Sequence, residues 1–264
     1  MEFQFRAALL HYWLQKDKAK PYAERAYQLD PDGYIGAWAK AFTFPRGSPK
    51  FMKYLSLAIE RNPVHALVLL HRAQAYNFRG FIHHRPEEFE MGLADAQRAL
   101  ELAPNNQESL WIIGESYTRM GKFAEAEPYL KRVLEISPHH HMALASYAEW
   151  HLKQRQFEEA LEKLSHALAV KPTQYHLLKR RAVALFHLGR FDEALADLRE
   201  ARERKPIDMS TLLWISPTLL ATCPQESFKR GLRELADEAV QNSDDSQRAH
   251  RSRMQLCIGL GEWE

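Results

Sequence analysis

Apolar residues recur along this chain at the three- and four-residue spacing that places them on one face of a helix. Leu110, Ile113 and Tyr117 form one such series, and Ala126 and Leu130 begin another a few residues later. A polar stretch that contains a glycine separates the two series. This arrangement predicts two amphipathic helices joined by a short turn, because a strand would show a two-residue period instead.

Prolines divide the helical pattern into units of similar length. The apolar series end at Pro31, Pro63, Pro104, Pro138, Pro172 and Pro206, and the last three intervals are 34 residues each. A proline is tolerated at the start of the following helix, where its missing N–H costs little. Within their units, Gly80, Gly121 and Gly189 are expected to end the first helix, because glycine adopts the left-handed conformation of a helix C-terminus without strain.

The unit at residues 107–140 resembles a tetratricopeptide repeat, a helix–turn–helix of about 34 residues with small and large apolar residues at fixed positions. The matching residues are Leu110, Ile113, Gly114, Tyr117, Ala126, Leu130 and Pro138. Residues 141–174 and 175–206 match in the same way, whereas the earlier units match less closely. In one of these, the segment GFIHHRPEE that begins at Gly80 is expected to insert roughly seven residues before the next helix resumes near Phe89.

The resemblance implies an all-α fold, an α-solenoid in which about six to seven helix pairs stack as a right-handed superhelix. It implies one domain over residues 1–264, with repeats near residues 2–31, 34–63, 66–104, 107–138, 141–172 and 175–206 and a degenerate helical region at 209–264. Small residues such as Gly114 let the two helices of a pair approach closely. In this family the first helix of each pair lines a concave surface.

The overall charge gives little information about a binding partner. The chain has 36 basic and 34 acidic residues, a formal net charge of +2, so composition alone indicates neither nucleic acid nor an anionic membrane as partner. No window approaches the ~18 apolar residues that a membrane-spanning helix needs, and the N-terminus lacks a signal-peptide pattern. The two cysteines, Cys223 and Cys257, suit a reducing compartment, so a cytoplasmic protein is expected.

No motif in the sequence predicts catalysis or a cofactor. The chain lacks HExxH, GxSxG and paired CxxC motifs, and no base neighbours either cysteine in the sequence. His139, His140 and His141 lie in a turn between repeats without a cysteine or carboxylate at metal-ligand spacing, so a solvated turn is favoured over a metal site. The same applies to His83 and His84. We therefore expect no enzymatic activity, no bound metal and no cofactor.

The resemblance implies which side chains line the concave surface. In the N-terminal half they are Trp38, Phe42, Leu67, Leu70, His71, Gln74, Phe78, Trp111 and Ile112, and in the C-terminal half Glu115, Arg119, Glu149, Lys153, Lys179, Arg180, Val183 and His187. A surface that is apolar at one end and charged at the other suits an amphipathic peptide or helix with aromatic anchors. In the alternative interpretation, Trp38 and Trp111 belong to the core between repeats, and Glu149 pairs with Lys179 within the scaffold.

Three functions are compatible with the sequence. The favoured one is a scaffold or adaptor that binds a protein or peptide segment, because the repeats provide a surface and no catalytic motif is present. The second is a regulatory or targeting region of a larger enzyme, such as a kinase or glycosyltransferase. The third is RNA binding, suggested by KRRAVALFHLGR and RAHRSR, although acidic residues interleave with the basic ones.

Two further expectations concern the family's chaperone-binding subclass and the C-terminal end. That subclass places an asparagine at the ninth position of a first helix, where this chain has Gln74, Glu115, Glu149 and Val183, so a receptor for chaperone tails is not expected. Residues 246–264 resemble the first helix of another repeat whose second helix does not follow. We hypothesise that the chain is a fragment of a longer repeat protein, or that this uncapped end self-associates with another copy.

Overall fold

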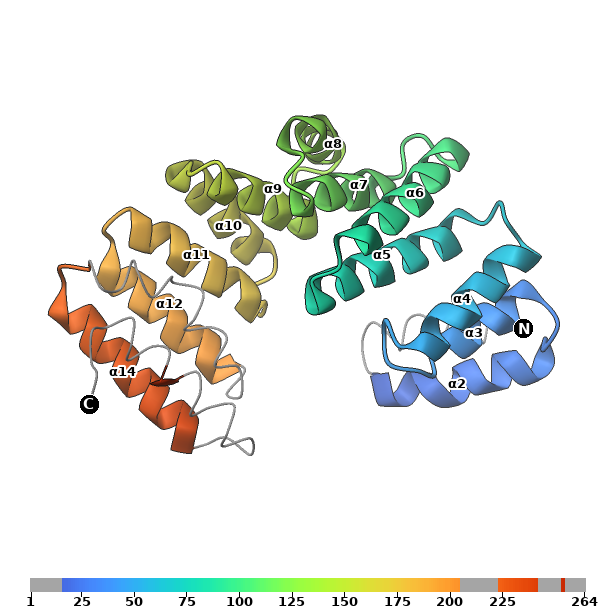
Figure 1. The fold of residues 1–264 in the computed structure, drawn as a ribbon, viewed down its shortest axis with the longest axis horizontal. Coiled ribbons are helices and arrows are strands. Elements are labelled where there is room, and N and C mark those ends of the chain that lie inside the picture. Colours follow the sequence, from blue (N-terminus) through green and yellow to red (C-terminus); the bar gives the residue numbers. More distant parts are fainter. Residues whose placement is uncertain (1–15, 205–222, 242–252, 255–264) are drawn as a thin grey trace. The chain divides into compact units, whose positions relative to one another are not determined.

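The computed structural model describes residues 16–204, 223–241 and 253–254, and within them the chain forms α-helices and no strand (Figure 1). The prediction of an all-α helical repeat fold is therefore confirmed. The chain divides into two compact units, Met1–Ser137 and Pro138–Glu264, which we call unit 1 and unit 2 and describe separately. The single-domain organisation expected from the sequence stays a prediction.

Successive helices pack against one another within each unit. In unit 1 they are α2 (Lys16–Leu29), α3 (Tyr34–Ala41), α4 (Pro49–Arg61), α5 (Ala66–His83), α6 (Pro86–Leu102), α7 (Gln107–Arg119) and α8 (Phe123–Ile136). In unit 2 they are α9 (His141–Lys153), α10 (Phe157–Val170), α11 (Tyr175–His187), α12 (Phe191–Arg204) and α14 (Glu226–Gln241). Helices α3, α5, α7, α9 and α11 are the first helices of their pairs.

The turns inside three of these pairs share one backbone geometry. Gly121 and Gly189 have positive φ angles of 74° and 73°, as the sequence predicts, and Arg155 holds the equivalent place with φ 60°. In each turn the residue that follows donates its N–H to a carbonyl of the last helical turn. The bonds are Lys122 N to Tyr117 O, Gln156 N to His151 O and Arg190 N to Leu185 O, each 2.9 Å long. This closing bond therefore forms with or without glycine at the left-handed position.

The end of α5 differs from the prediction. The helix does not stop at Gly80 but continues to His83, and His84 takes the left-handed conformation with φ 53°. Helix α5 is thus 18 residues long, compared with 13 in α7, α9 and α11. A Cβ atom at Gly80 would lie 3.0 Å from Cε1 of Phe89, so this glycine permits close helix packing rather than ending the helix. The expected insertion is an added helical turn.

The interior of each pair depends on small residues where its two helices meet. In the pair of α7 and α8, a Cβ atom at Gly114 would lie 2.7 Å from Cδ2 of Leu130, so a larger residue there would overlap the leucine. In unit 2, Ala148 and Ala182 are fully buried. Close approach in turn buries the large side chains between repeats.

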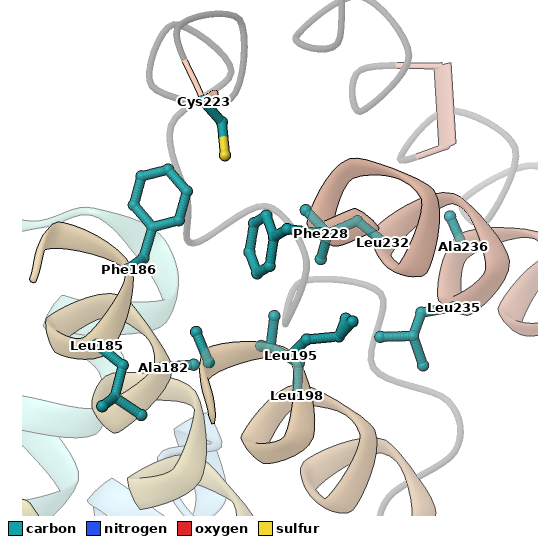
Figure 2. Packing of buried hydrophobic residues seen from close by; sticks show 11 residues of the cluster. Ala182, Leu185, Phe186, Leu195, Leu198, Cys223, Phe228, Leu232, Leu235 and Ala236 are labelled. Carbon is teal, nitrogen blue, oxygen red and sulfur yellow. The ribbon is translucent and has the colours of Figure 1, made fainter. Parts of the chain in front are cut away.

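Helix α14 covers the apolar side of the α11–α12 pair (Figure 2). Phe228 of α14 is fully buried, and its ring centroid lies 5.4 Å from that of Phe186 on α11. Leu232 of α14 belongs to the same cluster as Leu195 and Leu198 of α12. Together with Cys223 and their neighbours they form one buried core, so part of the region expected to be helical but degenerate packs as a helix against the α11–α12 pair.

Several sequence predictions fall on residues outside the described ranges. They include most of residues 246–264, which were expected to form a terminal uncapped helix, and the cysteine at position 257. Among the helices that the structure does describe, none combines the length and apolar character needed to cross a bilayer.

Candidate functional site

Five of the apolar side chains expected to line the binding surface of unit 1 are buried. They are Trp38, Phe42, Leu70, Trp111 and Ile112, none more than 7% exposed. The indole of Trp38 packs against the rings of His65 and His71 at centroid distances of 5.1 and 5.4 Å and donates its Nε1–H to Nδ1 of His71 at 2.9 Å. The expectation that these residues anchor a partner is therefore corrected, because neighbouring helices already cover them. They belong to the core between repeats.

Polar side chains also connect successive repeats of unit 1. Arg46, in the loop before α4, donates to Oε1 of Gln74 on α5 at 2.6 Å, and Gln74 in turn donates to Glu108 on α7. Further along the same helices, Asn77 and Ser116 share a buried hydrogen bond of 2.9 Å. Gln74, which the sequence assigned to the binding surface, is thus buried in a row of hydrogen bonds that stabilises the stack.

The environment of His71 keeps its imidazole neutral. Burial is the main cause that lowers its pKa to about 3, and the charges of Arg46 and His65 act in the same direction. Its Nδ1 must accept the indole hydrogen of Trp38, which a protonated ring cannot do. His71 therefore supports the core of unit 1.

Exposed apolar side chains gather at the C-terminal end of α5. Phe78, Phe81 and Ile82 are 43%, 45% and 50% exposed, and we call these three residues the Phe81 patch. Their spacing of three and four residues places them on one face of the helix. They continue the stripe that begins with Leu67 and His71, of which Leu67 is also exposed. The sequence predicted Phe78 but missed Phe81 and Ile82, because these were expected in an inserted segment rather than on a helical turn.

An arginine of α7 lies over one ring of the Phe81 patch, and a second arginine is adjacent to the patch in the sequence. The guanidinium of Arg119 on α7 lies 4.7 Å from the ring centroid of Phe81 and is held by Glu115 at 3.1 Å. Arg79, next to the patch, binds the buried carboxylate of Glu88 at 2.7 Å. Glu115 and Arg119, which the sequence assigned to the charged half of the surface, thus interact with each other next to the ring of Phe81.

In unit 2, the expected surface residues interact mainly with one another. Glu149 of α9 pairs with Arg180 of α11 at 2.8 Å, so Glu149 takes part in the scaffold, as the alternative interpretation expected. Lys179 is buried, and its ammonium lies 5.8 Å from the Tyr175 ring.

Two histidines of α11 have lowered pKa values. Burial is the first cause for His176, whose pKa falls to about 4, with Arg180 adding to the effect. His187 stacks on Phe157 at a centroid distance of 4.1 Å, and burial followed by the charge of Arg155 lowers its pKa. Lys153 is exposed and Val183 is partly buried. The first-helix residues of unit 2 therefore form a polar, internally paired surface.

A separate cleft of about 400 Å³ lies between α10, α11 and α12. Arg181 lines this cleft and donates two hydrogen bonds to Asp197, of 2.8 and 2.6 Å. Arg190 likewise donates two hydrogen bonds to Glu193. The basic stretch that suggested RNA binding, which begins at Lys179, thus contributes Arg181 to an internal ion pair.

The histidines at the turn before α9 have structural partners. His140 accepts the backbone N–H of Ala143 at 3.1 Å and so caps the helix, while Nδ1 of His139 lies 2.8 Å from Nε2 of His166. Within the described ranges, no group of three or more histidine, cysteine or acidic side chains is arranged to hold a metal ion.

Comparison with known proteins agrees with this geometry. A family model described as tetratricopeptide repeat matches residues 117–182 and 151–213, and a second model of the same description matches residues 87–141. The chain belongs to the tetratricopeptide repeat family. Repeats of this family form a fold that mediates protein–protein interaction and is typically not catalytic.

Solved structures share the fold of this tetratricopeptide repeat protein at low sequence identity. A chain of the APC/C hetero-tetramer Cut9–Hcn1 gives a TM-score of 0.75 at 14% identity, covering 94% of this chain and 47% of that one. This protein therefore spans about half the length of that chain. A tetratricopeptide repeat protein from Parabacteroides merdae gives 0.62 at 15% identity, with 97% and 98% covered. PilW, a type IV pilus biogenesis factor, gives 0.61 at 18% identity, with 81% and 98% covered. Comparison with curated proteins gives no match.

Proposed function

We propose that this protein is a non-catalytic interaction scaffold, and that the Phe81 patch of unit 1 binds a segment of a partner protein. One observation carries the proposal: three large apolar side chains on one face of α5 are each more than two-fifths exposed. Contiguous exposed apolar surface marks interaction sites, and aromatic side chains dominate their binding energy.

The arrangement of the site supports a binding role over a purely structural one. The core aromatics, such as Trp38 and Trp111, are covered by neighbouring helices, whereas the turn that holds Phe81 and Ile82 is additional to the ordinary repeat. Packing of the repeat does not require these exposed side chains. Arg119 beside Phe81 adds a charged group at the edge of the apolar surface, as in interfaces with a polar rim.

Site-specific photo-crosslinking tests this proposal. A benzophenone amino acid at Phe81 should capture a partner, and the same group at Met91, which is 50% exposed on α6, should not. Capture at position 81 should also be lost when Phe78→Ser is added, because that substitution removes an anchor without opening the core. Equal capture at positions 81 and 91, or capture that is insensitive to Phe78→Ser, would contradict binding at the patch.

A further inference from the structure

We propose that the segment bound at the Phe81 patch is acidic and amphipathic, with apolar side chains that cover the patch and carboxylates that meet the arginines at its edge. This inference rests on the proposed function and specifies the chemistry of the partner. It is carried by the arginines near the patch, whose positive charge exceeds the negative charge of the carboxylates they contact.

The arginines that neighbour the patch in the sequence, Arg79 and Arg85, carry an excess of positive charge. Arg79 and Arg85 share one carboxylate oxygen of Glu88, at 2.7 and 3.8 Å. The Glu88 side chain is only 5% exposed, whereas that of Arg85 is 57% exposed. One buried carboxylate therefore faces two guanidinium groups, and the charge that reaches solvent is positive. The exposed His83 and His84 add no negative charge.

The α7 edge of the patch also presents a guanidinium. Arg119 lies over the ring of Phe81, and its contact with Glu115 leaves both side chains partly exposed, at 14% and 18%. A carboxylate that approaches Phe81 from solvent would meet this cation at the rim of the apolar surface. Charge-assisted hydrogen bonds of this kind orient a bound segment.

Two exposed acids of α6 lie on the face of that helix that is turned away from α5. Glu87 and Glu90 are exposed on α6. Phe89 of α6 packs against Gly80, and Gly92 lies against Ala73, so the side of α6 that carries Phe89 and Gly92 faces α5. At 100° per residue, Glu87 and Glu90 are turned away from that contact. Their carboxylates thus point away from the helix that carries the patch.

The size of the patch limits the length of the bound segment. Phe78, Phe81 and Ile82 span little more than one helical turn, which corresponds to two or three apolar side chains of a partner. A basic segment with the same apolar residues would meet like charges at Arg85 and Arg119, and such contacts disfavour the wrong partner. Acidic residues beside the apolar ones satisfy both requirements.

Selection from a displayed library of random twelve-residue peptides tests the inference. The full chain is the bait, and a variant with Phe78→Ser, Phe81→Ser and Ile82→Ser removes peptides that bind elsewhere. Circular dichroism checks that this variant keeps its fold, as expected for exposed positions. Selected peptides should combine two apolar residues three or four positions apart with at least two aspartates or glutamates.

One selected peptide, labelled with fluorescein, is then measured by anisotropy. Phe81→Ser should weaken binding by at least ~10-fold. Arg85→Glu should weaken it by roughly 3–10-fold at low salt, and the loss should shrink at high salt because screening removes the charge effect. Arg98→Glu makes the same charge change on the exposed side of α6 and serves as the matched control.

The outcomes separate the two proposals. Selected peptides that are neutral or basic, but whose binding is lost with Phe81→Ser, would overturn the acidic partner and leave the binding site intact. Peptides that bind the Phe81→Ser variant as well as the natural chain would overturn both proposals. The same conclusion follows if no peptide is selected.

Discussion

Arg72 binds Asp95 with the same pair of hydrogen bonds by which Arg181 binds Asp197. The Nε–H and one terminal N–H reach the two carboxylate oxygens at 2.7 and 2.8 Å in the first pair and at 2.8 and 2.6 Å in the second. Each aspartate lies nine residues before the proline that closes its repeat. The two pairs therefore occupy one equivalent position, in repeats that belong to different units.

Removing one partner of such a pair should destabilise its unit. The side chain of Asp197 is 6% exposed and that of Arg181 is 27% exposed. Asp197→Ala therefore removes a buried carboxylate and leaves the partly buried guanidinium of Arg181 without this partner. We expect the free energy of unfolding to fall by about 1–3 kcal/mol, measured by urea denaturation. Glu193→Ala, which removes an exposed partner of Arg190, is the control and should have a much smaller effect. Equal losses for both variants would show that burial of Asp197 does not matter.

The turn at Arg155 offers a stabilising substitution. Its φ of 60° is left-handed, and the equivalent turns contain Gly121 and Gly189. Arg155→Gly should therefore raise the free energy of unfolding by about 0.5–1 kcal/mol, because it relieves the strain that a Cβ atom causes in this conformation. The reverse change, Gly121→Ala, should lower it by about 1 kcal/mol, although a Cβ atom there would meet no other atom within 4 Å. Melting temperatures that move in the opposite directions would contradict this account.

Acid should weaken unit 1 through His71. Burial is the main reason its pKa falls to about 3 in the folded chain, well below the ordinary value of 6.5. The unfolded chain then binds the proton first, so the stability contributed by neutral His71 is complete above pH 6.5 and declines as the pH falls toward 3. The slope is at most about 1.4 kcal/mol per pH unit.

Comparison with His71→Gln isolates this effect from all other titrating groups. The stability difference between the natural chain and this variant should shrink as the pH falls from 6.5 to 4.5. A matching experiment with His176→Gln should show the same trend, ending near pH 4, since burial and Arg180 lower the pKa of His176 to about 4. A difference that stays constant with pH would mean that folding does not lower the pKa of the histidine.

Truncation of a core aromatic should lower stability, whereas truncation of a surface aromatic should lower partner binding and leave stability nearly unchanged. Trp38→Ala removes a side chain that is 3% exposed and should cost about 3–5 kcal/mol of unfolding free energy. Phe81→Ser changes a side chain that is 45% exposed and should leave the melting temperature nearly unchanged while it abolishes partner binding. Differential scanning calorimetry separates the two, and a large loss of stability in Phe81→Ser would assign that ring to the core.

The repeat fold can be predicted from the sequence because the glycines and prolines between its helices act through direct physical causes. A positive φ at Gly121 and Gly189 follows from the absence of a Cβ atom, and prolines mark the intervals between helices. The same reasoning fails at Gly80, where the missing Cβ serves packing against Phe89 instead of a turn. One residue type thus answers two different structural needs, and the local sequence does not distinguish them.

The candidate site is harder to predict than the fold. The repeat register identifies which face a side chain occupies, but burial depends on how far the neighbouring helices extend. Trp38 and Phe78 hold comparable surface positions in the sequence pattern, yet the first is covered and the second is exposed. Such differences follow from three-dimensional packing.

The added turn of α5 also shows where the length of a repeat can vary without cost to its register. The bond from Arg85 N to Gly80 O, 3.1 Å long, closes the longer helix in the same way as the bond that closes α7. Beyond it, Asp95 still reaches Arg72 on the helix before. Extra residues at the tip of a helix pair therefore change the length and the surface side chains of that tip, and they leave the packing of the two helices on each other intact. Recombinant variants with α5–α6 tips of different length, exchanged as cassettes between Gly80 and Phe89, would give a graded series of recognition surfaces on one unchanged frame.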